Sequence, residues 1–278
     1  MWIAAALVTT LSFGTNNAIF KWSTAKGLSK VHIQFFFYLV AFLLTFSYGI
    51  AKGLVQFNML TIILGSFIGI LNANGNIQMS KAFEKGPASL TSPLIAINAI
   101  FPILGAGLIF HEQISSIQWT GIIIMLASAV LIQYGPNSKG NIHYLPWIYR
   151  VLLAVISFGG LGVLMKTSAH LNINSLSILI CMYGGGSLYL AICSTKIKEK
   201  WLKQEVNIGM FTGLISIVGY SSYFFALNTG IASIVFPIVS LNCIVVVLVG
   251  YWLFKERLKF YQVIGVLTAL VGVVFTKI

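Results

Sequence analysis

Polar amide side chains gather within one otherwise apolar stretch of the sequence, ILNANGNIQMSKAF. Asn72, Asn74, Asn76 and Gln78 fall close together there, and each would be costly to expose to hydrocarbon without a partner. Because Asn72 and Asn76 are four residues apart, they share one face of a helix. An amide offers two donors and a carbonyl acceptor, which suits a neutral or zwitterionic ligand. We expect this face to line a polar cavity; the alternative is hydrogen bonding between helices.

Further candidates for the cavity wall occur at matched positions in the second half of the chain. Ser216 and Tyr220 follow Asn72 and Asn76 by 144 residues. The same offset relates Asn98 to Asn242, and each lies near the middle of an apolar stretch, where it serves either a ligand or a contact between the two halves. The predicted cavity wall comprises Asn16, Asn17, Asn72, Asn76, Asn98, Ser216, Tyr220, Tyr223 and Asn242.

Two lysines and two prolines also occupy matched places in the halves. Lys21 and Lys166 each end an apolar stretch. We expect them at the two mouths of a path, where they either snorkel to the interface or attract anionic groups. Pro93 and Pro237 each remove one backbone hydrogen bond from a helix. They are therefore hinge candidates, with a fixed bend as the alternative.

The charged residues argue against catalysis within the apolar stretches. Every acidic residue lies in a loop or at the end of a stretch: Glu84, Glu112, Glu199, Glu205 and Glu256. Glu112 and Glu256 each precede an apolar stretch, so we expect them to complement the positive end of the helix that follows. The four histidines also fall at the ends of stretches, and none has metal spacing with another. The sequence thus predicts no catalytic residue, no metal site and no cofactor, and disfavours an integral-membrane enzyme.

The elements that must position these residues are membrane helices. The 278 residues are 58% hydrophobic and 8% charged, with a mean hydropathy of +0.93, and about 20 apolar residues suffice to cross a bilayer. Ten candidate spans follow: 2–21, 32–51, 59–80, 87–110, 116–134, 146–166, 173–194, 208–227, 230–254 and 260–277. The charges behind the net +12 sit mainly in short loops between these spans and at their ends, so they report orientation and not nucleic-acid binding.

The chain repeats itself. Residues 82–130 and 226–274 align without a gap, and 14 of the 49 positions are identical, among them a proline, an asparagine, a glutamate and a glutamine. At an offset of 145, Trp2 and Lys21 match Trp147 and Lys166. We predict a first repeat at 1–137, a connector at 138–145 and a second repeat at 146–278. Because five spans are an odd number, the second repeat is inverted relative to the first.

The paired segments resemble a known family. GPASLTSPLIAIN with FHEQISSIQWTGIIIML, and GIASIVFPIVSLN with FKERLKFYQVIGVLTAL, are similar to the EamA domain, which occurs twice in ten-span members of the drug/metabolite transporter superfamily. The resemblance implies an all-α integral membrane protein of two inverted five-helix repeats. It also implies a central cavity lined mainly by spans 1, 3, 4, 6, 8 and 9, for substrates such as amino acids, sugars, nucleotide sugars, choline or drugs.

The basic residues predict the orientation. With Lys21 and Arg150 counted at their nearest span ends, odd-numbered loops carry 14 lysines and arginines, and even-numbered loops with the C-terminus carry three. The positive-inside rule places the odd loops in the cytoplasm. Both termini of this multi-pass protein of the cell (plasma or inner) membrane are then outside, whereas the resembling family is usually drawn with both inside.

The function expected from these features is that of a secondary transporter or facilitator. Alternating access between inverted repeats would move a small polar metabolite that is neutral, zwitterionic or anionic, by facilitation or exchange. The alternatives are a carrier or flippase of a lipid or lipid-linked metabolite and, less favoured, an enzyme or an ion channel. The expected partners are a small-molecule substrate and the lipid bilayer, without nucleic acid, for a monomer or homodimer.

Overall fold

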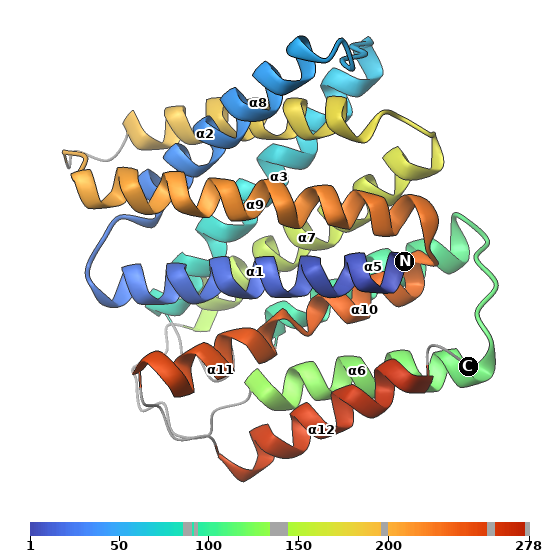
Figure 1. Ribbon diagram of the computed structural model, residues 1–278. Helices are drawn as coiled ribbons and strands as arrows, with labels where there is room; N and C mark the ends of the chain where they lie inside the picture. Colours follow the sequence, from blue (N-terminus) through green and yellow to red (C-terminus); the bar gives the residue numbers. More distant parts are fainter. Residues whose placement is uncertain (86–90, 92–93, 134–143, 196–199, 255–258, 276–278) are drawn as a thin grey trace.

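The computed structural model describes residues 1–85, 91, 94–133, 144–195, 200–254 and 259–275, and every regular element within those ranges is a helix (Figure 1). The first half contains α1 (Trp2–Ala25), α2 (Lys30–Ala51), α3 (Met59–Lys85), η1 (Ile97–Ala99), α5 (Ile100–Leu108) and α6 (Ser116–Gln133). The second half contains α7 (Tyr144–His170), α8 (Ser175–Thr195), α9 (Lys203–Thr229), α10 (Ala232–Ser240), α11 (Asn242–Phe254) and α12 (Phe260–Phe275).

These helices confirm the predicted all-α membrane architecture. In the described part of the chain, 7 helical stretches are long and apolar enough to span a bilayer. Three shorter apolar helices, Leu94–Leu108, Ser116–Ile132 and Phe260–Phe275, stand where the fourth, fifth and tenth spans were predicted. Large apolar side chains point away from the bundle, such as Leu188 and Ile192 on α8, which are 69% and 61% exposed. An outward surface of this kind belongs in lipid.

The two repeats are interleaved and do not stand side by side. In the first repeat α1 packs against α9 and α11, and in the second repeat α7 packs against α3 and α5. Likewise α2 contacts α8 and α9, whereas its contact with α3 of its own repeat is slight. Figure 1 shows α1 and α9 side by side, with α6 and α12 paired at the lower edge. Most of the core is therefore formed between the repeats.

One crossing within this core is exceptionally close. A Cβ on Gly69 of α3 would lie 1.9 Å from the carbonyl oxygen of Met182 on α8. Only glycine lets the two backbones approach so closely, which is how small residues work in membrane helix packing.

The ninth span is interrupted and not continuous. We predicted one helix over 230–254 with a hinge at Pro237, but α10 ends at Ser240 and α11 begins at Asn242. Pro237 lies inside α10, four residues before the interruption. The other hinge candidate, Pro93, lies outside the described residues, as does most of the predicted connector, whose last two residues belong to α7.

Side-chain hydrogen bonds from two asparagines accompany the irregular regions of the fourth and ninth spans. The amide nitrogen of Asn242 donates to the carbonyl of Val239 at 2.9 Å. Asn98, its partner in the repeat, donates in the same way to the carbonyl of Ile95 within the 3₁₀ region of the fourth span. An asparagine that bonds a carbonyl three residues back competes with the helical ladder. The matched asparagines thus fix matched irregularities in the two repeats.

Candidate functional site

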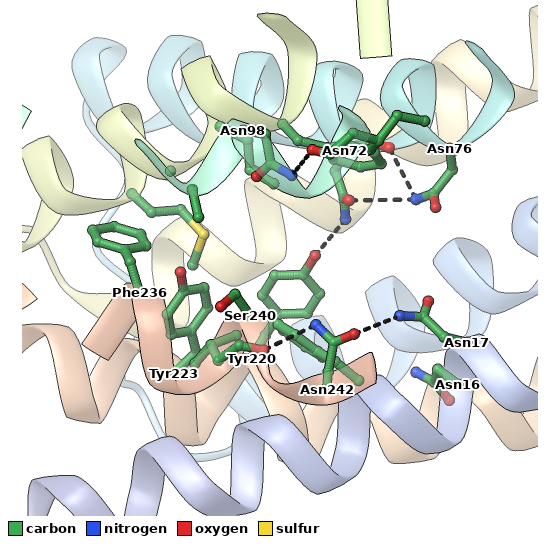
Figure 2. A pocket seen from close by; sticks show the side chains of 18 of the residues that line it. Asn16, Asn17, Asn72, Asn76, Asn98, Tyr220, Tyr223, Phe236, Ser240 and Asn242 are labelled. Carbon is green, nitrogen blue, oxygen red and sulfur yellow. Dashed lines mark hydrogen bonds between the residues drawn. The ribbon is translucent and has the colours of Figure 1, made fainter. Parts of the chain in front are cut away.

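A cavity of about 250 Å³ lies between the repeats. Its walls come from α1, α2, α3, α7 and α9, together with the fourth span and the interrupted ninth span. All nine residues predicted for the cavity wall line it, and Figure 2 shows eight of them from close by. No described lining residue carries a charge. The remaining lining residues are Phe13, Phe20, Phe37, Met79, Ile95, Ala96, Ala99, Pro102, Phe158, Leu161, Gly162, Met165, Phe236, Val239 and Ser240.

Amides from opposite repeats meet on one side of the cavity. The side-chain nitrogen of Asn17 on α1 donates to Oδ1 of Asn242 at 3.2 Å, directly beside the break before α11 (Figure 2). Asn242 therefore has two roles, since it bonds the Val239 carbonyl and also presents its oxygen to the first repeat. Asn98 lies on the facing wall. The two hypotheses for these asparagines, lining of the cavity and contact between the repeats, are therefore compatible: Asn242 does both.

The amide cluster of α3 divides between two faces. Asn72 donates to the hydroxyl of Tyr220, and Asn76 donates to the carbonyl of Asn72 at 3.0 Å, so both belong to the cavity wall. Asn74 and Gln78 turn away from the cavity. Asn74 donates to Ser157 Oγ on α7 at 3.0 Å, and Gln78 accepts from the Arg150 guanidinium at 2.8 Å. One face of the helix therefore lines the cavity, and the other joins neighbouring helices.

Asn16 leaves one polar atom of the wall unused. Its nitrogen donates to the backbone carbonyl of Thr212 at 3.3 Å. Its Oδ1 is buried and has no hydrogen-bond partner in the described part of the protein. A buried acceptor without a donor costs about 1–3 kcal/mol.

Aromatic rings hold the apolar side of the cavity. Phe13 contacts Tyr220 and Tyr223 with ring centroids 4.6 and 5.8 Å apart, and Tyr223 meets Phe236 edge to face at 6.0 Å. Behind them the hydroxyls of Tyr183 and Ser216 are 3.1 Å apart. Rings locked in this way restrict the rotamers of the wall, so the cavity is largely formed before any ligand enters.

Lys166 lies away from the cavity wall in an ion pair with Glu112. Its Nζ is 2.8 Å from Glu112 Oε1, and the same carboxylate accepts from the backbone nitrogens of Ala232 and Ser233 and from the Ser233 hydroxyl. Burial alone would raise the pKa of Glu112, but Lys166 and the donors of Ser233 and Ala232 together hold this pKa below its ordinary value. Any charge that Lys166 offers to a solute is therefore largely neutralised.

Glu112 also corrects an expectation. We expected it to complement the helix that follows it, α6, but it caps the N-terminus of α10 in the other repeat. A carboxylate does stabilise the positive N-terminus of a helix here. That helix, however, is α10, whose first residue is 120 residues further along the chain. Lys21, the repeat partner of Lys166, is exposed and does not line the cavity. Glu256 lies outside the described residues.

A second buried ionisable pair was not expected from the sequence. His32 at the start of α2 and Glu205 at the start of α9 are 0% and 2% exposed, and Nδ1 of His32 lies 3.0 Å from Oε2 of Glu205. From the sequence, His32 is expected at the end of a span and Glu205 in a loop or at the end of a span, and neither is expected to be buried. A glutamate in the first turn of a helix is visible in the sequence, but the neighbour that buries it is not. In the described chain no three His, Cys, Asp or Glu residues gather as a metal site would require.

Comparison with known proteins agrees with this architecture. The sequence matches the EamA-like transporter family over residues 1–134 and again over 145–278. This chain belongs to that family. A solved structure, described only as the crystal structure of a protein, is similar to this chain with a TM-score of 0.77 and 12% sequence identity. The match covers 99% of this chain and 98% of the other chain. At that identity the likeness shows the fold alone.

A curated relative matches a shorter stretch. It is the probable 4-amino-4-deoxy-L-arabinose-phosphoundecaprenol flippase subunit ArnE of Aeromonas hydrophila subsp. hydrophila, 37% identical over 49 residues. The match covers 18% of this chain and 43% of that protein, so the chain spans less than half the length of this relative.

Proposed function

We propose that this membrane protein is a secondary transporter or facilitator that moves a small neutral or zwitterionic metabolite through the cavity between its repeats. The observation that carries the proposal is the cavity itself, with amides and hydroxyls from both repeats in its wall. Membership of a family of transporters supports it.

The size and the charge of the cavity narrow the substrate class. Sites for drug-sized ligands occupy roughly 300–1,000 Å³, and this cavity of about 250 Å³ is smaller. A net charge is expensive to hold where no described lining group carries the opposite one. Amide groups satisfy the donors and acceptors of an uncharged or zwitterionic solute instead.

The interleaved repeats supply a route for alternating access. Wall residues on α1 and α11 belong to opposite repeats and meet at the Asn17–Asn242 contact. If one repeat rocks against the other, the contacts on one side of the cavity open while those on the other side close. The interruption at Leu241 lets α10 and α11 change their angle without breaking a continuous helix.

The test begins with a screen of uncharged and zwitterionic metabolites for a raised melting midpoint of the purified protein, since a ligand of the native state stabilises it. Uptake of the best ligand into proteoliposomes follows. We expect Asn76→Leu to lower uptake and to abolish the ligand-dependent shift. Absence of both binding and uptake for every class tested, including charged metabolites, would refute the proposal.

Asn74→Leu is the matched control, because Asn74 is two residues away on the same helix but bonds Ser157 on α7 and does not line the cavity. We expect it to lower the melting midpoint and to leave the ligand-dependent shift intact. Equal losses of ligand response in the two variants would mean that the amides of α3 act on folding and not on the substrate.

A lipid or lipid-linked sugar is the second candidate substrate, and the local match to the flippase subunit ArnE favours it. Such a substrate would place only its polar head in the cavity, while its chains remain in the bilayer. A scrambling assay with a labelled lipid-linked sugar separates the candidates. Scrambling without uptake of any soluble metabolite favours the carrier of lipids. For either function we expect a monomer or a homodimer in the cell membrane.

A further inference from the structure

A second, smaller pocket lies outside the cavity, where α3 and α8 begin. It measures about 140 Å³ and is almost entirely polar, with Gln56, Asn58, Thr61, Leu171, Asn172, Ile173 and Asn174 around it. The N-termini of α3 and α8 meet there: the backbone nitrogen of Gln56 donates to Ser177 Oγ at 2.9 Å. Two helix N-termini that converge favour negative charge.

The internal repeat relates this junction of α3 and α8 to the junction of α2 and α9. With the offsets of the repeat, Thr61 corresponds to Glu205, Asn58 to Leu202 and Asn174 to Ser29. The N-termini of α9 and α2 therefore meet as those of α3 and α8 do, which agrees with the packing of α2 on α9 and of α3 on α8. At that equivalent junction the side chain is a carboxylate.

The Glu205 carboxylate bonds both helix ends at once. Its Oε1 accepts from the backbone nitrogen of Ser29 at 2.7 Å, and its Oε2 accepts from that of Leu202 at 3.1 Å and lies 3.0 Å from His32 Nδ1. At the junction of α3 and α8 the corresponding backbone donors belong to Asn58 and Asn174, and both residues line the small pocket. Thr61 is too short to reach both of them, and space remains where the carboxylate would be.

Thr61 itself supplies an unused polar atom. It is 1% exposed, it lines the pocket, and its Oγ1 has no hydrogen-bond partner in the described part of the chain. The amide oxygens of Asn58 and Asn174 accept from the backbone of Thr61 and Ser177 at 2.7 and 3.1 Å. Those bonds leave the NH₂ ends of both amides as the donors. The pocket is thus rich in donors and has no described anion of its own.

We propose that this pocket binds a small oxyanion, a carboxylate or a phosphate group, which joins α3 to α8 as the Glu205 carboxylate joins α2 to α9. The Thr61 hydroxyl and the amides of Asn58 and Asn174 donate to it. The oxyanion is either a soluble ion or the phosphate of a lipid headgroup, because both present the same oxygens. This site is separate from the transport cavity and does not depend on the identity of the transported substrate.

The decisive variant is Thr61→Glu, which places a carboxylate in the pocket as the second repeat does. The melting midpoint is measured in neutral detergent with sodium acetate or sodium phosphate against sodium chloride at equal ionic strength. We expect the wild-type midpoint to rise by several degrees with phosphate or acetate, and to follow the logarithm of the concentration once binding is saturated. Thr61→Glu should melt higher than the wild type in chloride and show no further rise.

Two further measurements test the role of the Thr61 hydroxyl and the source of the oxyanion. Thr61→Val removes the hydroxyl at nearly constant shape, so it should weaken the phosphate response by about tenfold in concentration, a loss typical of one hydrogen bond to a charged group. Phosphatidic acid in mixed micelles tests the lipid source: a rise with this lipid and none with the soluble ions assigns the site to a headgroup. No rise with any of the three probes, or the same rise in the wild type and in Thr61→Glu, would overturn the proposal.

Discussion

The Nζ atom of Lys166 lies 2.8 Å from Oε1 of Glu112, and the two side chains are only 11% and 14% exposed. Glu112 belongs to the loop between α5 and α6, and Lys166 to α7. Since the carboxylate also caps α10, one charge holds together three elements of two repeats.

Glu112→Gln should destabilise the protein. The amide keeps the shape, but it leaves Lys166 buried without its counter-charge, which we expect to cost about 2 kcal/mol for a partly buried pair. The folded-state pKa of Glu112 is lowered from its ordinary 4.5. Its stabilisation is therefore complete above that value and is lost as the pH falls through the lowered pKa. Thermal unfolding of the wild type should thus lose more stability below pH 4.5 than that of Glu112→Gln. Parallel pH profiles of the two proteins would contradict this account.

Gly69→Ala should be severely destabilising, by about 3 kcal/mol, because the new methyl group meets the Met182 carbonyl and a backbone cannot move aside cheaply. Gly107→Ala on α5 is the control, since a Cβ there meets nothing within 4 Å. Melting midpoints of the two variants in the same detergent check the difference. If both variants melt alike, the close crossing of α3 and α8 is absent from the purified protein.

Asn242→Ala should reduce transport more than it reduces stability. It removes the bonds to Val239 and Asn17, worth about 1 kcal/mol each, and it also removes an amide from the cavity wall. We expect Asn98→Ala to behave in the same way from the opposite repeat. Yield and melting midpoint are compared with uptake. Collapse of yield in both variants would assign these asparagines to structure alone, and normal uptake would make them bystanders.

Uptake of the identified substrate should not follow an imposed pH gradient. The cavity has no described carboxylate or histidine in its wall, so no group there exchanges a proton with the substrate path. Proteoliposomes with and without the gradient provide the measurement. Accumulation that tracks the gradient and vanishes when it is collapsed would show proton coupling, and His32 with Glu205 would become the first groups to substitute.

Both termini should face outside. The prediction follows from the 14 basic residues of the odd-numbered loops against three on the other side. A C-terminal reporter that is active only after translocation should be active, and one that is active only in the cytoplasm should be silent. The opposite pattern would mean that the orientation usual for the family prevails over the charge count.

Many residues of the cavity wall could be predicted from the sequence because the geometry of a helix is local. The four-residue spacing of Asn72 and Asn76 placed them on one face, and the repeat offset brought Ser216 and Tyr220 to the same wall. The repeat also matched Asn98 to Asn242, whose hydrogen bonds to the third residue before them proved alike. These inferences need only the period of a helix and the presence of a duplicate.

The ion pairs were beyond such reasoning because they depend on contacts between distant segments. Nothing near Glu112 in the sequence indicates that it caps α10, and nothing near Glu205 indicates that His32 and Ser29 enclose it. The interruption at Leu241 was likewise not predicted. Pro237 shows where one backbone hydrogen bond is lost, but it does not show where the helix ends. Local sequence patterns therefore predict the helices, whereas the burial of Glu112 and Glu205 depends on how the two repeats pack together.

The interleaving of the repeats has a consequence for the assembly of the newly made chain. Helix α1 is complete at residue 25, but its principal neighbour α9 does not begin until residue 203. At roughly 5–20 residues per second, the ribosome needs roughly 10–40 s to supply that neighbour. During this interval α1 stands in the bilayer with its amides Asn16 and Asn17 unpacked. The packing of α1 against α9 must therefore wait until most of the chain has been synthesised.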